Sequence, residues 1–262
     1  MEHLLDGALA HAAAVFGLAL GTARETWRAA TGAEPGEGGG LRRLAPALLG
    51  VAVGLHLIVG IVVVDKPFVA AVTTLLRDTF YGASLGVFAA ASLGTVTLRG
   101  RWRGLAALGA AWGLARLGHA ASAGTWSAAM VWTTLHIVAA VVWLGGLGMA
   151  VWGGARDVRR FGRVALGCVG VLGITGGLRT AQLVGAGWDR LGDGPEGVTW
   201  IAALLMKGGV VGVALVCAWR ARRALRTDGS AAAVTAAAVT GELYAVGIVV
   251  ILAALLARLP TP

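Results

Sequence analysis

Histidines are the residues of this sequence with the clearest capacity for chemistry. His136 lies inside an apolar run from about Ala128 to Gly154, and a run of that length can cross a bilayer, which takes ~20 apolar residues. An ionisable side chain inside such a span marks a functional site by default. Neutral imidazole is a ligand for copper, zinc, iron and nickel. We therefore expect His136 to lie at or near a functional site.

Three more histidines fall in the same half of their predicted spans as His136. With a rise of ~1.5 Å per residue, His11 and His136 each lie on the order of 10 Å from one end of their spans. His56 lies past the midpoint of its span on that side, and His119 lies close to that end of its own. These four residues predict a metal or cofactor site. For each one taken alone, a hydrogen bond between helices is the alternative interpretation.

The N-terminus offers a different type of site at His3. Met1-Glu2-His3 places an imidazole third in the chain, behind a free amine and two backbone amides. Those four nitrogens can form the square-planar set that copper(II) or nickel(II) prefers. A disordered chain end is the alternative.

Membrane helices are the elements that must position these residues. The chain has 262 residues, of which 57% are hydrophobic and 13% charged, and its mean hydropathy is +0.78, far from the composition of a soluble domain. We predict an all-α, polytopic membrane helix bundle of about eight transmembrane helices, in a single domain over residues 1–262. The predicted spans are Leu4 to Ala23, Leu44 to Val64, Thr79 to Leu98, Gly104 to Ala121, Ala128 to Gly154, Gly162 to Val184, Thr199 to Trp219, and Gly241 to Ala257.

Arginines orient the predicted bundle. They follow the first, third, fifth and seventh spans, at Arg24, Arg28, Arg42 and Arg43; Arg99, Arg101 and Arg103; Arg156, Arg159, Arg160 and Arg163; and Arg220, Arg222, Arg223 and Arg226. The positive-inside rule places those alternate connections in the cytoplasm and both termini outside. This topology accounts for the net charge of +9, so we expect lipid and no nucleic acid as a partner. We also expect a multi-pass protein of a bacterial inner membrane with periplasmic termini.

The two halves of the chain resemble each other weakly. His11 and His136 are each followed ten residues later by a glycine. This spacing predicts a parallel repeat of four plus four helices, with halves 1–123 and 124–262, because an even number of crossings restores the orientation. Shared membrane composition is the alternative.

Four other ionisable residues fall within the predicted spans: Lys207, Arg179, Arg116 and Glu242. Lys207 is too deep to reach the interface easily, so it must pair, be neutral, or line a wet cavity. Arg179 and Arg116 can extend outward to the interface.

Closely spaced glycines suggest smooth helix faces. They occur at Gly50 and Gly54, at Gly82 and Gly86, and in the series Gly167, Gly170 and Gly173. Such spacing predicts close contact between helix backbones.

Several short segments, mostly in the second half, carry a family resemblance. They are Gly118-His119-Ala-Ala; Leu135-His136-Ile-Val-Ala-Ala-Val-Val-Trp143-Leu-Gly145-Gly146; Arg160-Phe161-Gly-Arg-Val-Ala; Gly173-Ile-Thr-Gly176; Leu205-Met-Lys207; Glu242-Leu-Tyr; and Leu259-Pro260. They resemble the copper resistance protein D family over roughly Gly118 to Pro260. The segment that begins at His136 is the most specific.

The resemblance implies an eight-helix inner-membrane protein that moves periplasmic copper towards the cytoplasm, often with a small periplasmic copper-binding partner. It implies a copper-ligand role for His119 and His136. His11, His56 and His3 are candidate metal ligands only because of their depth or their geometry. Met130, Met149 and Met206 are dispersed and form no methionine-rich segment, which argues against a copper(I) path lined by thioethers.

Two other functions stay open. A haem b-binding subunit of a redox complex would use His11 and His136 at equal depth, as related families use membrane histidines with porphyrin. A structural subunit of a larger membrane complex would use the histidines for packing. The sequence contains no nucleophile with an adjacent base and no nucleotide-binding motif, so an enzyme is not expected.

Overall fold

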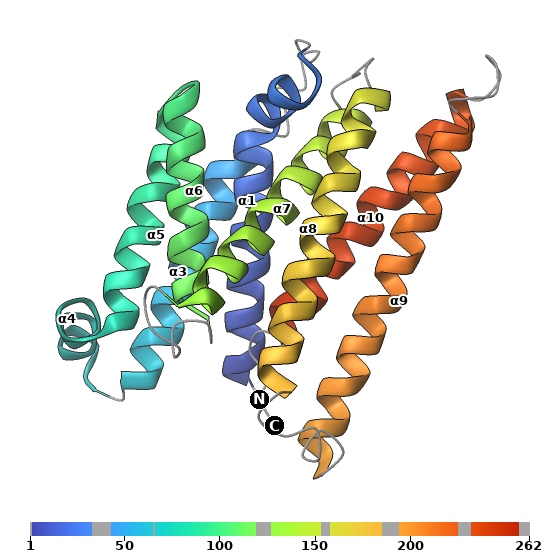
Figure 1. Cartoon of the computed structure of the whole chain (residues 1–262). Coiled ribbons are helices and arrows are strands. Elements are labelled where there is room, and N and C mark those ends of the chain that lie inside the picture. Colours follow the sequence, from blue (N-terminus) through green and yellow to red (C-terminus); the bar gives the residue numbers. More distant parts are fainter. Residues whose placement is uncertain are drawn as a thin grey trace.

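The computed structural model describes residues 2–32, 43–64, 66–118, 127–152, 158–184, 194–224 and 232–256, and in these ranges it contains helices and no strand (Figure 1). The helices are α1 (Glu2–Thr31), α3 (Leu44–Val64), α4 (Phe68–Asp78), α5 (Phe80–Thr97), α6 (Arg101–Arg116), α7 (Ala128–Trp152), α8 (Val158–Val184), α9 (Gly194–Ala224) and α10 (Ala232–Leu256). The predicted all-α bundle is confirmed.

Seven of these helices are long and apolar enough to cross a membrane, namely α1, α3, α5, α7, α8, α9 and α10. The remaining predicted span, Gly104 to Ala121, corresponds to α6, which has 16 residues and ends at Arg116. α6 nevertheless lies beside α5 within the bundle (Figure 1). The chain is therefore a multi-pass membrane protein whose outer helix faces contact lipid.

Helix α1 is the central element of the bundle. It contacts α3, α5, α6, α7, α8 and α10, and small residues allow this. Ala10, Ala14 and Ala19 are completely buried on α1. A Cβ atom placed on Gly145 of α7 would lie only 2.7 Å from the Ala19 carbonyl oxygen, so α7 can approach α1 this closely only with glycine there.

Phe161 of α8 fills the space beside the next glycine of α7. A Cβ atom on Gly146 would overlap its ring. The same ring stacks on Trp27 of α1 with centroids 5.4 Å apart, and both aromatic side chains are buried. Gly145 and Gly146 thus allow α7 to pack closely against α1 and α8 at the same height in the bundle.

The other glycine spacings do not mark helix contacts within this chain. A Cβ atom on Gly50, Gly54, Gly86, Gly167, Gly170 or Gly173 would meet nothing within 4 Å. The prediction of close packing is wrong at these positions, because the faces that carry them point away from neighbouring helices. It is confirmed only for Gly82, which lies against the backbone of Leu75.

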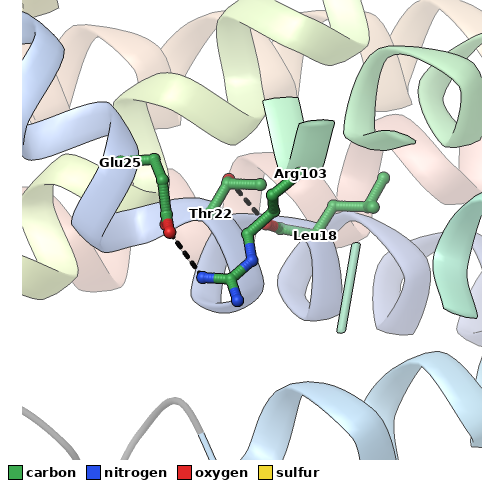
Figure 2. Close-up of polar contacts among 4 residues, drawn as sticks. All are labelled: Leu18, Thr22, Glu25 and Arg103. Atoms are coloured by element: carbon green, nitrogen blue, oxygen red, sulfur yellow. Dashed lines mark hydrogen bonds and ion pairs between the residues drawn. The ribbon is translucent and has the colours of Figure 1, made fainter. Parts of the chain in front are cut away.

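A buried ion pair links α1 to α6. Arg103 donates from Nη1 to Oε1 of Glu25, as Figure 2 shows, and only 2% of Arg103 is exposed. One turn earlier on α1, Thr22 donates to the Leu18 carbonyl oxygen at 2.8 Å. The sequence placed Arg103 in a cytoplasmic connection, but the structure places it in the first turn of α6.

The helices of the two chain halves meet in the same cyclic order. In the first half, α1 contacts α3, α3 contacts α5, α5 contacts α6, and α6 contacts α1; in the second half, α7, α8, α9 and α10 do the same. Figure 1 shows that α1 begins and α10 ends at the same end of the bundle. A parallel repeat with halves 1–123 and 124–262 stays a prediction.

Candidate functional site

Three of the predicted site residues lie at similar depth on three helices. Taking ~1.5 Å per residue, His11 on α1, His56 on α3 and His136 on α7 lie about 9 to 12 Å from the ends of their spans. Those span ends are the start of α1, the end of α3 and the start of α7, which lie at one end of the bundle (Figure 1).

His11 and His56 are in direct contact. Their ring centroids are 4.8 Å apart and the ring planes meet at 70°. Both side chains are buried, and His56 is completely so. Because α1 packs along α3, two imidazoles that are distant in the sequence become neighbours in an apolar environment.

Tyr81 of α5 holds His56 in place. The Nδ1 atom of His56 lies 2.8 Å from the Tyr81 hydroxyl, and that hydroxyl also donates to the His56 carbonyl oxygen at 3.2 Å. The ring of Phe88 stands edge-on to His56 with centroids 6.1 Å apart. The sequence analysis missed Tyr81, although a tyrosine at the start of an apolar span is a signal that could have indicated a buried polar contact.

His11 connects this pair to a cavity. Its Nδ1 atom lies 3.3 Å from the Gly7 carbonyl oxygen, which can only accept, so Nδ1 carries a proton. A Cβ atom on Gly118 would lie 3.9 Å from Nε2 of His11. His119 follows Gly118 in the sequence but lies outside the described residues, and the side chain of His3 is likewise not described.

His136 is oriented by Thr175 of α8. Its Nδ1 atom lies 2.9 Å from the Thr175 hydroxyl oxygen, and that hydroxyl donates to the Val171 carbonyl oxygen at 2.6 Å. The hydroxyl oxygen therefore accepts a hydrogen bond from Nδ1–H. In the neutral ring, the lone pair is then on Nε2. Metal-ligating histidines are commonly oriented in this way, by a hydrogen bond from the ring nitrogen that does not bind the metal. Thr175 was within a segment quoted for the family resemblance, but its partner was not foreseen.

A cavity of about 240 Å³ joins the parts of the site. His11 and His136 both line it, together with Arg179 and Lys207. Lys207 thus satisfies one of the three conditions expected of it, since it lines a cavity. The remaining walls are mainly apolar side chains from α1, α6, α7, α8, α9 and α10.

Trp143 connects the cavity to a buried carboxylate. Trp143 lines the cavity, and its Nε1 atom donates to Oε1 of Glu242 on α10 at 3.0 Å. Both side chains are buried. Glu242 lies near the start of the α10 span, and its hydrogen bond with Trp143 joins α10 to α7.

The ligand geometry available here is that of histidine pairs. Within the described ranges, no group of three or more His, Cys, Asp or Glu side chains is close enough to hold one metal ion. The structure brings His11 to His56 directly, and His11 to His136 through the cavity.

Comparison with protein-family models, with curated proteins and with solved structures finds no match to this chain.

Proposed function

We propose that this protein handles copper in a bacterial inner membrane, taking the ion from the periplasmic side through His11, His56 and His136. The observation that carries the proposal is that His11 touches His56 and also lines the cavity that contains His136. A chain of imidazoles across α1, α3 and α7 offers successive ligands to a single ion.

Imidazole chemistry supports copper at this site. Neutral imidazole suits copper among the transition metals, and copper(I) accepts a pair of ligands in a linear arrangement. His136 presents Nε2 as its lone-pair nitrogen because Thr175 occupies Nδ1. Two-ligand geometry also agrees with the lack of a three-ligand cluster among the described residues.

Cavity size favours an ion over a porphyrin. Pockets for drug-sized ligands occupy roughly 300–1,000 Å³, and a porphyrin is larger than most such ligands. The cavity beside His11 and His136 has about 240 Å³, below that range, which favours a bare ion.

The proposed topology follows from the arginines. We place the end of the bundle that holds the three histidines on the periplasmic side, with both termini there. A small periplasmic copper-binding protein is the proposed source of the ion, and it would deliver the ion to this end.

Copper binding by the purified protein tests the proposal. We expect stoichiometric copper(I), measured by competition with a coloured chelator under reducing conditions. His56→Ala and His136→Ala should each weaken copper binding at least tenfold, while Leu135→Ala, next to His136 but partly exposed to lipid, should not. Equal affinity in all variants, or no bound copper, would overturn the proposal. A Soret band in the same sample would support haem instead.

A further inference from the structure

The cavity carries an excess of positive charge. Arg179 of α8 and Lys207 of α9 both line it, and neither forms an ion pair with any residue that the structure describes. No carboxylate is among its described lining residues. Glu242, the acidic residue of α10, accepts a hydrogen bond from the Trp143 indole N–H and is not among the residues that line the cavity.

Two cations inside a membrane need compensation. A charged side chain within the bilayer is costly unless it pairs, or reaches water or the interface. Arg179 and Lys207 lie about 5 and 9 Å from the ends of their spans, on the same side of the bundle, at ~1.5 Å per residue. An anionic group that reaches below the membrane surface would compensate these charges.

The walls around these cations suit an apolar molecule. Leu172, Leu204, Val246 and Val250 line the same cavity. The other polar lining residues include His11, His136, Thr133 and Thr180. A ligand that matches both features has an apolar body and an acidic group.

Helix α9 has little contact with the helix that precedes it. It packs along α10 and touches α8 only slightly, as their separation in Figure 1 indicates. Leu205 and Met206, next to Lys207 in sequence, are 70% and 57% exposed. The two cations thus lie on either side of the weakest contact between consecutive helices of the second half.

We propose that the cavity binds a free, single-chain amphipathic acid that enters from the bilayer between α8 and α9. Its carboxylate lies between Arg179 and Lys207, and its chain lies against Val246 and Val250. A volume of about 240 Å³ admits only a compact body. The depth of Lys207 favours a free acid over a phospholipid, because the phosphate of a phospholipid stays at the interface. The acid would share this cavity with His11 and His136, but its charged partners are Arg179 and Lys207, and the inference does not depend on copper.

Binding of radiolabelled decanoate to the full-length protein in detergent tests this site. We expect saturable binding at one molecule per chain. Lys207→Gln and Arg179→Gln should each weaken it at least tenfold, whereas Lys207→Arg should weaken it less than threefold. Arg77→Gln, on the short helix α4 away from the cavity, serves as the matched control and should bind like the unaltered protein. Uncharged decanol should compete at least tenfold less well than unlabelled decanoate.

Three results would overturn the inference. They are equal decanoate affinity in the glutamine variants, decanol competing as well as decanoate, and displacement by short-chain phosphatidic acid at much lower concentration than by decanoate. A copper titration of Lys207→Gln separates the two proposals. Retained copper binding shows that the variant is folded, so loss of decanoate is then specific. Conversely, His56→Ala, at a proposed copper ligand outside the cavity lining, should weaken copper binding while it keeps decanoate affinity within threefold.

Discussion

The Nδ1 atom of His136 lies 2.9 Å from the hydroxyl oxygen of Thr175, and this contact selects the ring nitrogen that can act as a ligand. The Thr175 hydroxyl donates its hydrogen to the Val171 carbonyl oxygen, so Nδ1 of His136 is the donor in the hydrogen bond between His136 and Thr175. α7 and α8 pack side by side, which keeps the ring from turning.

Thr175→Val should weaken copper binding without removing a ligand. Loss of a group that orients a metal-ligating histidine typically costs about 10–100-fold in affinity, and we expect a loss in that range by chelator competition. Thr97→Val is the matched control, because Thr97 makes the same bond to its own helix and is exposed. Unchanged affinity in Thr175→Val would show that the contact does not prepare His136.

Arg103→Ala should destabilise the bundle. Removal of one partner from a buried ion pair costs about 3–5 kcal/mol, and Glu25 would lose the cation that Arg103 supplies to α1. We expect about 3 kcal/mol, the lower figure, because Glu25 is 22% exposed. Thermal unfolding in detergent measures this. Arg101→Ala, where the arginine stacks over Trp102, should change the melting temperature little; a similar fall in both variants would contradict the argument.

Gly146→Ala should destabilise the contact between α7 and α8. The added methyl group would collide with the Phe161 ring, and overpacking of this kind costs about 1–3 kcal/mol. Gly173→Ala provides the comparison, because a Cβ atom there meets nothing within 4 Å and alanine favours helix by up to about 1 kcal/mol. Melting temperatures should therefore move in opposite directions. A fall in both would indicate that Gly173 contacts a second protein chain.

Short epitope tags at the two ends test the topology. If the protein has the proposed orientation, with both termini outside as the positive-inside rule predicts, both tags should be reached by antibody once the outer membrane is opened and the inner membrane is intact. The control is a tag in the arginine-rich connection after the seventh span, which should react only after the inner membrane is permeabilised. The reverse pattern would invert the orientation and place the histidines on the cytoplasmic side.

The sequence predicted the helices better than their contacts. Apolar runs located every long helix, because span length follows from bilayer thickness. The prediction for α6 extended beyond the helix, which ends at Arg116. Glycine spacing failed at Gly50 and Gly173, among others, because the same spacing occurs on helix faces that meet no other helix in this chain.

The histidines show the same division between sequence and structure. Depth along a span follows from counting residues, so the common level of His11, His56 and His136 could be predicted. Rotation about the helix axis could not, since it depends on which neighbour each face meets. The contact of His56 with Tyr81 and that of His136 with Thr175 are therefore findings of the structure.

The sequence by itself determined that this chain is a helical membrane protein and approximately where its spans lie, and it predicted a common depth for His11, His56 and His136. Those properties follow from composition and from a fixed rise per residue. Only the tertiary structure decided that His11 meets His56, and that His136 shares a cavity with Lys207. Such proximities depend on how helices pack, because each helix presents several faces and its neighbours select which of them are buried.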